Sequence, residues 1–280
     1  MTSRHLAIVY VSAGLHRATV EPLNAIALKQ EAVLAHSFVD PIYNRTSFFF
    51  VGPNVAPSAA ALASAALEQL DFSQHTGQHP ALGAVDHVCF SPLGTTTLDE
   101  TATQASRFLQ TMTASQPHLP IYGYGHLTGH RLRDIRRRLG YFDMTASTAL
   151  ETLAQTLPAT PSTFNSSSTW SPKHGVMCVG VVPFVLNFNM RCRSSDSKAT
   201  VAKITASIRS KEVEALTLQH KEGAFEVACN LLQSSIVSPS DVLARARARA
   251  AQVGAEIVDS YTTGPTEDAL LESYNAKRGL

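Results

Sequence analysis

The order of secondary-structure patterns in the second half of the chain constrains its fold more than any other feature of the sequence. A long apolar run from Val176 to Met190 ends in the alternation of a strand, and a helical pattern follows it. Two more strands are predicted at Val213 to His220 and Phe225 to Leu231. A helix that begins after Ser238 and a last strand from Ala255 to Tyr261 complete the order β-α-β-β-α-β, which predicts a ferredoxin-like sheet with helices on one face.

The sequence also marks where these helices begin and end. Ser195-Asp196 is the expected cap of the first helix. Ser238-Pro239-Ser240-Asp241 has the signature of a capping box with proline at the first helical position, and Gly254 closes that helix. A short helix from Thr266 is expected after the last strand.

The first half of the chain is also mixed α/β, so we predict an α/β (α+β) protein of two subdomains. Its expected strands are 6–12, 33–39, 45–52, 85–91 and 120–124. Its expected helices are an Ala-rich segment from Pro57 to Leu70, a segment that opens at Thr97 with Glu100 in a capping box, and a basic segment from Arg131 to Leu139.

A polar segment separates the two halves. Ser, Thr and Pro make up eleven of the fifteen residues from Pro158 to Pro172, and such a composition buries little apolar surface. We therefore expect a first subdomain at 1–157, a linker at 158–174 and a second subdomain at 175–280.

Composition excludes several classes of protein. The 280 residues carry a net charge of +1, so no bulk field attracts the chain to nucleic acid or to a membrane surface. No apolar run reaches the ~18 residues that a membrane span needs. The four cysteines form no CxxC pair and are expected as free thiols in a reducing compartment. We expect a cytoplasmic protein, with the mitochondrion as the alternative because no acidic residue precedes Glu21.

The segment from His75 to Asp86, HTGQHPALGAVD, is the first that could carry chemistry. His75 and His79 are four residues apart, but Gly77 and Pro80 argue against a helix, and no Cys or His set completes a metal site, so we expect no metal. A loop histidine beside glycine is a candidate general acid or base, because the pKa of imidazole lies near neutrality. The alternative for such a residue is a hydrogen-bonded or surface histidine without a catalytic role.

The second such segment lies at a strand entrance. It runs from Val39 to Thr46 and contains Asp40, Asn44 and Arg45, a combination that can bind a carboxylate or an amide.

Together these two segments resemble the formiminotransferase family. The family's N-terminal subdomain has an Asp-to-Asn-Arg-Thr segment, a strand ending in Val-Gly, an Ala-rich helix and a His-x-Gly-x-His-Pro-x-x-Gly-x-x-Asp motif, which here ends at Asp86. The similarity continues through Phe90-Ser91-Pro92-Leu93, and the stretch from His126 to Tyr141 is similar to the short formiminotransferase-like proteins of plants. Beyond the linker the β-α-β-β-α-β order agrees with the family's second subdomain. The resemblance includes no cyclodeaminase domain, which the bifunctional animal enzymes carry.

The resemblance implies a function and a set of residues. The family moves a formimidoyl group from an amino acid such as N-formimidoyl-glutamate to tetrahydrofolate, a co-substrate of one-carbon metabolism and histidine degradation. It implies that His79 is the catalytic acid and base. It also implies a set of residues that bind substrate or folate: Asp40, Asn44, Arg45, Gly77, Gly83 and Asp86.

Several positions depart from the family pattern. Gln78 and Ala81 replace a glutamate and an arginine around the histidine, and Val181-Val182 replace an Ala-Arg pair. Three hypotheses therefore stay open: an active transferase, a folate or small-ligand binding protein without turnover, and a structural subunit of a larger assembly. We expect small-molecule partners and no membrane partner. We interpret the arginines of the segment from Arg131 to Leu139 as a solvated helix face, with contact to nucleic acid or an acidic partner as the less favoured alternative. A homodimer or membership of a larger complex is left open.

Overall fold

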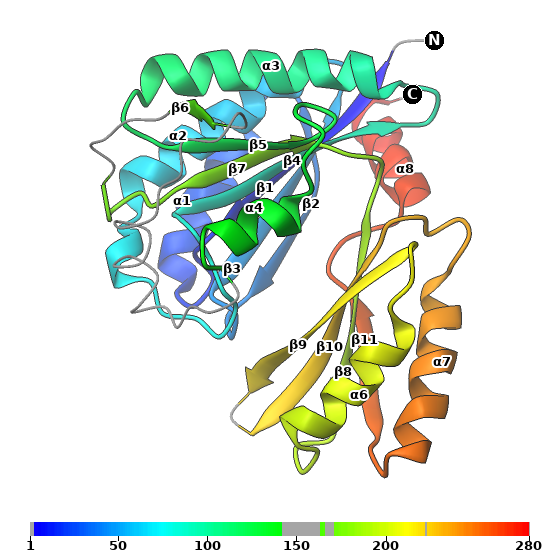
Figure 1. Cartoon of the computed structure of the whole chain (residues 1–280). Coiled ribbons are helices and arrows are strands. Elements are labelled where there is room, and N and C mark those ends of the chain that lie inside the picture. Colours follow the sequence, from blue (N-terminus) through cyan, green and yellow to red (C-terminus); the bar gives the residue numbers. More distant parts are fainter. Residues whose placement is uncertain (1–2, 142–162, 166–170, 222, 280) are drawn as a thin grey trace. The chain divides into compact units, whose positions relative to one another are not determined.

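The computed structural model describes residues 3–141, 163–165, 171–221 and 223–279. The chain forms two compact units. Unit 1 comprises Met1–Val182 together with Glu267–Leu280, and unit 2 comprises Pro183–Thr266. Figure 1 shows the elements of both units.

Unit 1 is built on a seven-stranded mixed sheet with the order β2-β3-β1-β4-β7-β5-β6. The strands β1 to β4 pair antiparallel in the order β2-β3-β1-β4, whereas β7 lies parallel to both β4 and β5. The bounds of these strands are Arg4–Val11 for β1, Val33–Asp40 for β2, Arg45–Gly52 for β3, Val85–Leu93 for β4, Ile121–Gly125 for β5, Thr163–Asn165 for β6 and Met177–Val181 for β7.

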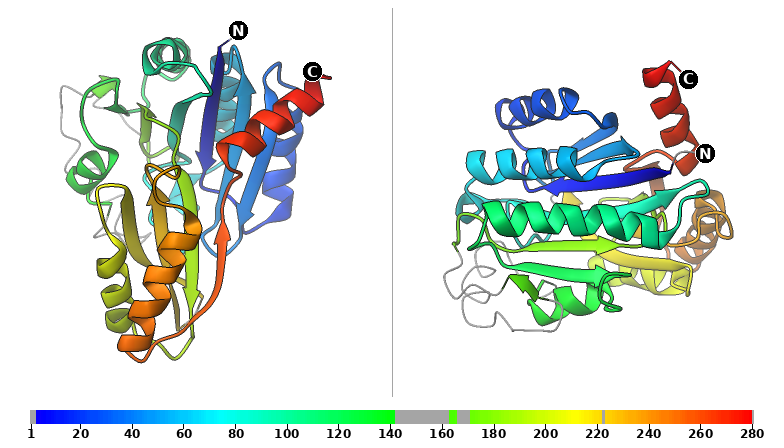
Figure 2. Two further views of the ribbon diagram at one scale, coloured as in Figure 1. Left: turned by 90° about the vertical axis from the view of Figure 1, so that its right-hand side faces the viewer. Right: turned by 90° about the horizontal axis from the view of Figure 1, so that it is seen from above.

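Three long helices cover one face of this sheet (Figures 1 and 2). They are α1 (Arg17–Leu28), α2 (Ala56–Gln69) and α3 (Leu98–Ser115). Alternate residues of the central strands, such as Val9 and Phe48, point to these helices and are fully buried. Because side chains alternate along a strand, the intervening residues must point to the opposite face.

The opposite face of the sheet is covered in part by a short helix, α4 (Leu132–Arg138). Ile135 of α4 packs in a small apolar cluster with Tyr122 and Tyr124 of β5 and with Cys178 of β7. The strands beside this cluster present polar and aromatic side chains on the same face, and these side chains form the site described below.

Unit 2 is a four-stranded antiparallel sheet with two helices. Its strands have the order β11-β8-β10-β9, and the chain order is β-α-β-β-α-β, which confirms the predicted ferredoxin-like plan. Residues of both helices and of the strand faces turned to them form one apolar core. The elements are β8 (Leu186–Cys192), α6 (Lys198–Ile208), β9 (Val213–Lys221), β10 (Ala224–Leu231), α7 (Pro239–Gln252) and β11 (Ile257–Thr262).

Two predicted helix caps are confirmed. Thr97 and Glu100 form a capping box at the start of α3, and Ser238 and Asp241 form another at the start of α7. The cap of α6 differs from the prediction: Ser197 accepts from the N–H of Thr200, whereas Asp196 accepts from Arg193 and from the backbone of Glu256. Asp196 therefore ties the start of α6 to β11. The helix α1 was not predicted.

The units divide at a different place from the one the sequence suggests. The apolar run from Val176 to Met190 is two strands, β7 in the sheet of unit 1 and β8 in the sheet of unit 2, with Pro183 between them. Proline lacks the N–H that would continue a ladder. Of the expected linker, 158–162 and 166–170 lie outside the described residues, and 163–165 pairs with β5.

The last helix, α8 (Glu267–Arg278), belongs to unit 1 and not to the second subdomain. It lies against β2 and β3, and Leu270 and Tyr274 are its buried side chains. Ser273 and Lys277 donate hydrogen bonds to the carbonyl oxygens of Ala35 and Leu34. The helix thereby satisfies backbone acceptors of β2, the strand at the edge of the sheet.

Candidate active site

A buried carboxylate stands at the centre of the polar face of unit 1. Asp86, at the start of β4, has a fully buried side chain. Its Oδ2 accepts hydrogen bonds from Nη1 of Arg45 at 2.9 Å and from Nη2 of Arg136 at 2.8 Å. Its Oδ1 accepts from the backbone N–H of Leu82 at 2.9 Å. One carboxylate therefore serves two guanidinium groups that come from β3 and α4.

This arrangement keeps Asp86 ionised. Burial by itself would raise the pKa of the carboxyl group, but the charges of Arg136 and Arg45 outweigh it and hold the pKa below its ordinary value. The two arginine side chains are each only 14% exposed. Because one negative charge faces two positive charges, the buried cluster carries an excess of one positive charge.

The imidazole of His79 lies at the rim of this cluster and is half-buried. The Tyr43 ring stands edge-on to it at 5.0 Å between centroids, and the Tyr141 hydroxyl lies 3.5 Å from its Nδ1. Nδ1 lies closer, at 2.7 Å, to the carbonyl oxygen of Pro80. We assign the proton to Nδ1 on that contact, which leaves the lone pair on Nε2.

The surroundings of His79 strongly disfavour its protonated form. Burial is the largest cause, followed by the charge of Arg45, and together they lower the pKa of His79 to about 3. The Pro80 carbonyl and Asp86 act in the opposite direction but do not compensate. At neutral pH His79 is therefore a neutral imidazole with a basic atom of low proton affinity.

Aromatic rings hold the two arginines in place. The guanidinium group of Arg45 lies over the ring of Tyr10 at 4.8 Å, and that of Arg136 lies over the ring of Tyr141 at 4.3 Å. Tyr10 in turn stacks on the buried His87, with ring centroids 4.9 Å apart and planes 6° from parallel. The site thus rests on an aromatic layer that fixes the direction of both cations.

The loop that carries His79 is fastened by Asn44. This residue has a φ of 49°, a left-handed conformation that asparagine tolerates better than most residues. Its Oδ1 accepts from the backbone of Gly14 and Leu15, each at 2.8 Å, and its Nδ2 donates to the carbonyl oxygen of Thr76 at 2.8 Å. Three loops are therefore joined by one side chain.

Two other predicted residues shape the same loops. Oδ1 of Asp40 accepts from the backbone N–H groups of Ile42 and Tyr43, each at 2.9 Å, and so forms the turn between β2 and β3. A Cβ at Gly77 would lie 2.5 Å from the carbonyl oxygen of Tyr43, so only glycine allows the His79 loop to approach this turn.

The structure brings some predicted residues together and sets others apart. Arg45 and Asp86 are in direct contact, and His79 lies within reach of their charges. Asp40, Asn44 and Gly77 support the loops around them. Gly83 forms an isolated β-bridge with Gly175. A Cβ at Gly83 would lie 2.4 Å from the carbonyl oxygen of Val176, so glycine at this position allows the two backbone segments to approach each other.

Several residues of the site were missed by the sequence reading. Arg136 lies in a basic helix that reads as a solvated face, and its partner Asp86 is 50 positions away. The aromatic residues Tyr43 and Tyr141 resemble ordinary core residues in the sequence. His87, on which Tyr10 stacks, was also missed. The sequence does hold a signal for it: side chains alternate along a strand, so His87 and Cys89 of β4 are expected on the face opposite the helices.

Buried neutral histidines make the folded protein sensitive to acid. Burial is the first cause that lowers the pKa of each of these histidines: His5, His36, His75, His79, His87 and His174. In the unfolded chain these histidines take up protons near their ordinary pKa of 6.5, whereas in the folded chain they do not. Their contribution to stability is therefore complete above that pH and is lost as the pH falls.

We expect His79 and His87 alone to cost about 2–3 kcal/mol of unfolding free energy between pH 7.5 and pH 5.5. Urea unfolding at the two pH values measures this loss. The variant His79→Gln should remove about 1.4 kcal/mol of it. Equal urea midpoints at both pH values would contradict the assignment.

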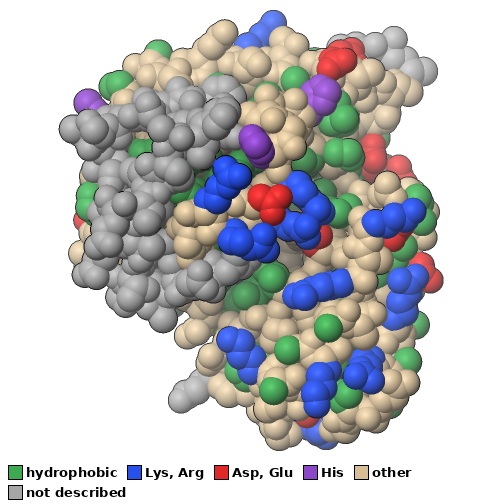
Figure 3. Space-filling model, viewed as in Figure 1, with side chains coloured by type: hydrophobic (Ala, Val, Ile, Leu, Met, Phe, Trp, Pro, Cys, Tyr) green, Lys and Arg blue, Asp and Glu red, His purple; other side chains and the backbone are tan. Residues whose placement is uncertain are grey.

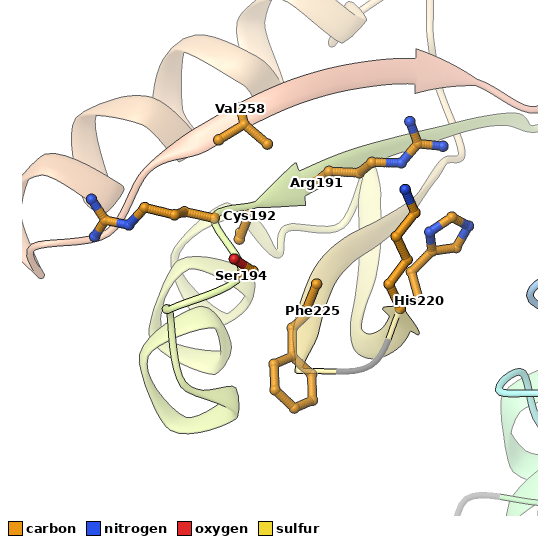
Figure 4. A pocket seen from close by; sticks show the side chains of 9 residues that line it. Arg191, Cys192, Ser194, His220, Phe225 and Val258 are labelled. Carbon is orange, nitrogen blue, oxygen red and sulfur yellow. The ribbon is translucent and has the colours of Figure 1, made fainter.

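Unit 2 holds a pocket of its own, of about 330 Å³, shown in Figure 4. Arg191 and His220 point to the same side of it, and Phe225 points away from both. Its arginines already have acidic partners, since Arg191 donates to Asp259 at 2.8 Å and Arg193 to Asp196 at 2.9 Å. The pocket contains none of the predicted site residues, and we place the candidate active site in unit 1.

Possible metal ligands and membrane-spanning helices were searched for in the described residues. Among the described residues, no group of three or more His, Cys, Asp or Glu side chains is placed to hold a metal ion. Within the same residues, no helix is both long enough and apolar enough to cross a bilayer.

Figure 3 shows Lys and Arg side chains gathered around α4 on one face of unit 1. The exposed Arg137 of this helix pairs with Asp134, whereas Arg136 is turned inward.

Comparison with known proteins gives a consistent result. Residues 5–182 match the formiminotransferase domain, N-terminal subdomain. A formiminotransferase cyclodeaminase-like protein of Arabidopsis thaliana is 29% identical over 95% of this chain and 94% of its own length. The formimidoyltransferase-cyclodeaminase of Rattus norvegicus is 26% identical over 90% of this chain, which spans only 48% of that protein. The glutamate formimidoyltransferase of Thermoplasma acidophilum is 25% identical over 68% of this chain and 61% of its own length.

Proposed function

Because this chain belongs to the formiminotransferase family, we propose that it is a folate-dependent transferase that moves a formimidoyl group from N-formimidoyl-glutamate or a related amino acid to tetrahydrofolate. The observation that carries the proposal is the position of one half-buried imidazole, His79, beside two guanidinium groups that share the carboxylate of Asp86. This combination supplies a proton acceptor and an anion-binding group within one cluster.

The reaction requires two proton movements. The N5 amine of tetrahydrofolate attacks the formimidoyl carbon and must lose a proton, and the amino group of the departing amino acid must gain one. Nε2 of His79 carries the free lone pair in our assignment, so it can accept the first proton and return it to the leaving amine. The pair of transfers leaves His79 neutral, as it began.

Arg45 is the residue that we assign to the carboxylate of the amino-acid donor. Its planar guanidinium group uses Nη1 for Asp86 and is held over Tyr10, which fixes the direction of its remaining N–H groups. Binding at this point would place the formimidoyl group near His79 and supply the positioning that a two-substrate reaction needs.

A second candidate function is a ligand-binding protein without turnover. The low basicity of His79, with its pKa lowered to about 3 by burial and by Arg45, favours this reading because a weak base assists proton transfer poorly. The two candidates differ in one measurable quantity, the formation of 5-formimidoyl-tetrahydrofolate.

The test is an assay of that product from N-formimidoyl-glutamate and tetrahydrofolate. We expect turnover by the unmodified protein. In Arg45→Gln we expect the KM for the donor to rise about 10- to 100-fold, because the loss of a charge-assisted hydrogen bond weakens binding by about that factor. The control is Arg137→Gln, which removes a guanidinium group that is 69% exposed. Donor binding without product would favour the second candidate, and an unchanged KM in Arg45→Gln would exclude the role of Arg45.

A further inference from the structure

The charges of the site do not balance. Arg45 and Arg136 both donate to the same oxygen of Asp86, and each uses a single terminal nitrogen to do so. The Nε of Arg136 is buried and has no hydrogen-bond partner among the residues that the structure describes. A buried, charged donor without an acceptor is costly, so the site is suited to a further anion.

We propose that Arg136 is a second anion-binding residue of this site, and that a carboxylate held by Arg136 and Arg45 makes His79 basic enough to accept a proton. This inference rests on the proposed function, because it takes the carboxylate to be that of the amino-acid donor. It assigns Arg136 a binding role toward the donor carboxylate, and the effect on the chemical step comes from the negative charge that this carboxylate brings near His79.

The charged groups that face His79 come from three elements. Arg45 lies on β3, Asp86 on β4 and Arg136 on α4, while the uncharged rings of Tyr43 and Tyr141 flank the imidazole. The sum of these charges is one positive charge. It opposes protonation of His79, and it is the part of the surroundings that an incoming anion can cancel.

The size of this effect follows from Coulomb's law. A unit negative charge about 6 Å from the imidazole, at an effective dielectric constant of about 20, raises the pKa by roughly two pH units. Additional burial by the ligand acts in the opposite direction, so a net rise of roughly one to two pH units is expected. This rise would begin from a low value, because burial and Arg45 hold the pKa of the free site at about 3.

This link between carboxylate binding and the pKa of His79 would make donor binding precede proton transfer. While the donor is absent, burial and the excess positive charge make His79 a weaker base than it is with a carboxylate bound. Once the donor carboxylate is bound, the same imidazole can accept the proton released by the attacking amine. Arg136 therefore links recognition of the donor to the chemical step.

The experiment is an NMR titration of His79 labelled at 13Cε1, assigned by the signal that disappears in His79→Gln. The free protein should keep a neutral His79 down to about pH 5. Saturating glutarate, an unreactive dicarboxylate, should move the titration curve upward by about one to two pH units. The uncharged glutaramide is the matched ligand control and should leave the curve in place.

The variant Arg136→Gln tests the assigned residue. Loss of its charge should raise the pKa of His79 in the free protein and reduce the further rise that glutarate causes. Arg137→Gln, one position along α4, should titrate like the unmodified protein. Glutarate that does not bind the unmodified protein, or that binds without moving the His79 curve, would overturn the proposal even if Arg136→Gln does not fold.

The titration needs no turnover, so the two proposals can fail separately. A shifted His79 curve without any formation of 5-formimidoyl-tetrahydrofolate would remove the transferase function and leave the coupling. Turnover with an unmoved curve would leave the transferase and remove the coupling.

Discussion

Replacing Asp86 with alanine is expected to destabilise the protein by about 3–5 kcal/mol, the cost of removing one partner from a buried ion pair. The carboxylate is fully buried and accepts from two guanidinium groups and from the backbone of Leu82. Its loss would leave Arg45 and Arg136, each only 14% exposed, without an opposing charge. Urea unfolding at pH 7.5 measures the change.

Two further variants separate charge from shape. Asp86→Asn retains an acceptor oxygen and nearly the same volume, so a loss comparable to that of Asp86→Ala would identify the missing charge as the cause. Asp134→Ala removes a carboxylate that is 44% exposed and pairs with Arg137, and should cost no more than about 0.5 kcal/mol. An Asp86→Ala protein as stable as the unmodified one would refute the buried-pair interpretation.

The second large effect is expected at His79. His79→Gln should lower kcat for formimidoyl transfer by about 10²–10⁴, the usual contribution of a general acid or base. Glutamine has similar length and keeps a hydrogen-bond donor for the Pro80 carbonyl, so the loop should remain folded. A fall in kcat with little change in the donor KM would indicate that the proton relay, and not binding, was removed.

The control for this variant is His126→Gln. His126 pairs with Asp99 and is 41% exposed, away from the cluster of Asp86. Its kcat should match that of the unmodified protein. Unchanged turnover in His79→Gln would falsify the catalytic role of His79 and leave the family membership of the chain untouched.

Local signals in the sequence predicted much of the fold. The capping boxes at Thr97 and Ser238 depend only on residues three positions apart, so they can be read without knowledge of the tertiary structure. The apolar residues at every second position of β10, from Phe225 to Leu231, likewise mark the face of one strand that packs in the core of unit 2. Such signals established the two-subdomain α/β class and the ferredoxin-like order of unit 2.

The boundary between the units could not be read in this way. The run from Val176 to Met190 is apolar throughout, and its composition does not say that β7 pairs in parallel between β4 and β5. Parallel pairing joins segments that are far apart in the chain, and periodicity carries no information on the partner. The Ser/Thr/Pro-rich segment is a clearer signal in the sequence, but the two units divide between Val182 and Pro183.

The residues of the candidate site likewise fall into two groups, those that sequence motifs identify and those that only the tertiary structure reveals. His79 and Arg45 stood out because they lie in motifs that resemble a known family. Arg136 did not, because its importance arises from a contact with Asp86 that the fold creates. The pKa of His79 also follows from burial and neighbouring charge, neither of which the residue type reveals.

The return of the chain to unit 1 in α8 has a consequence for biosynthesis. Leu270 and Tyr274 leave the ribosome only after every strand and helix of unit 2 has been made. The later unit can therefore reach its native state first, while the edge of the earlier sheet still lacks the donors of Ser273 and Lys277. During that interval the carbonyl oxygens of Leu34 and Ala35 in β2 lack these partners, and an edge strand with open backbone groups is prone to pair with another chain.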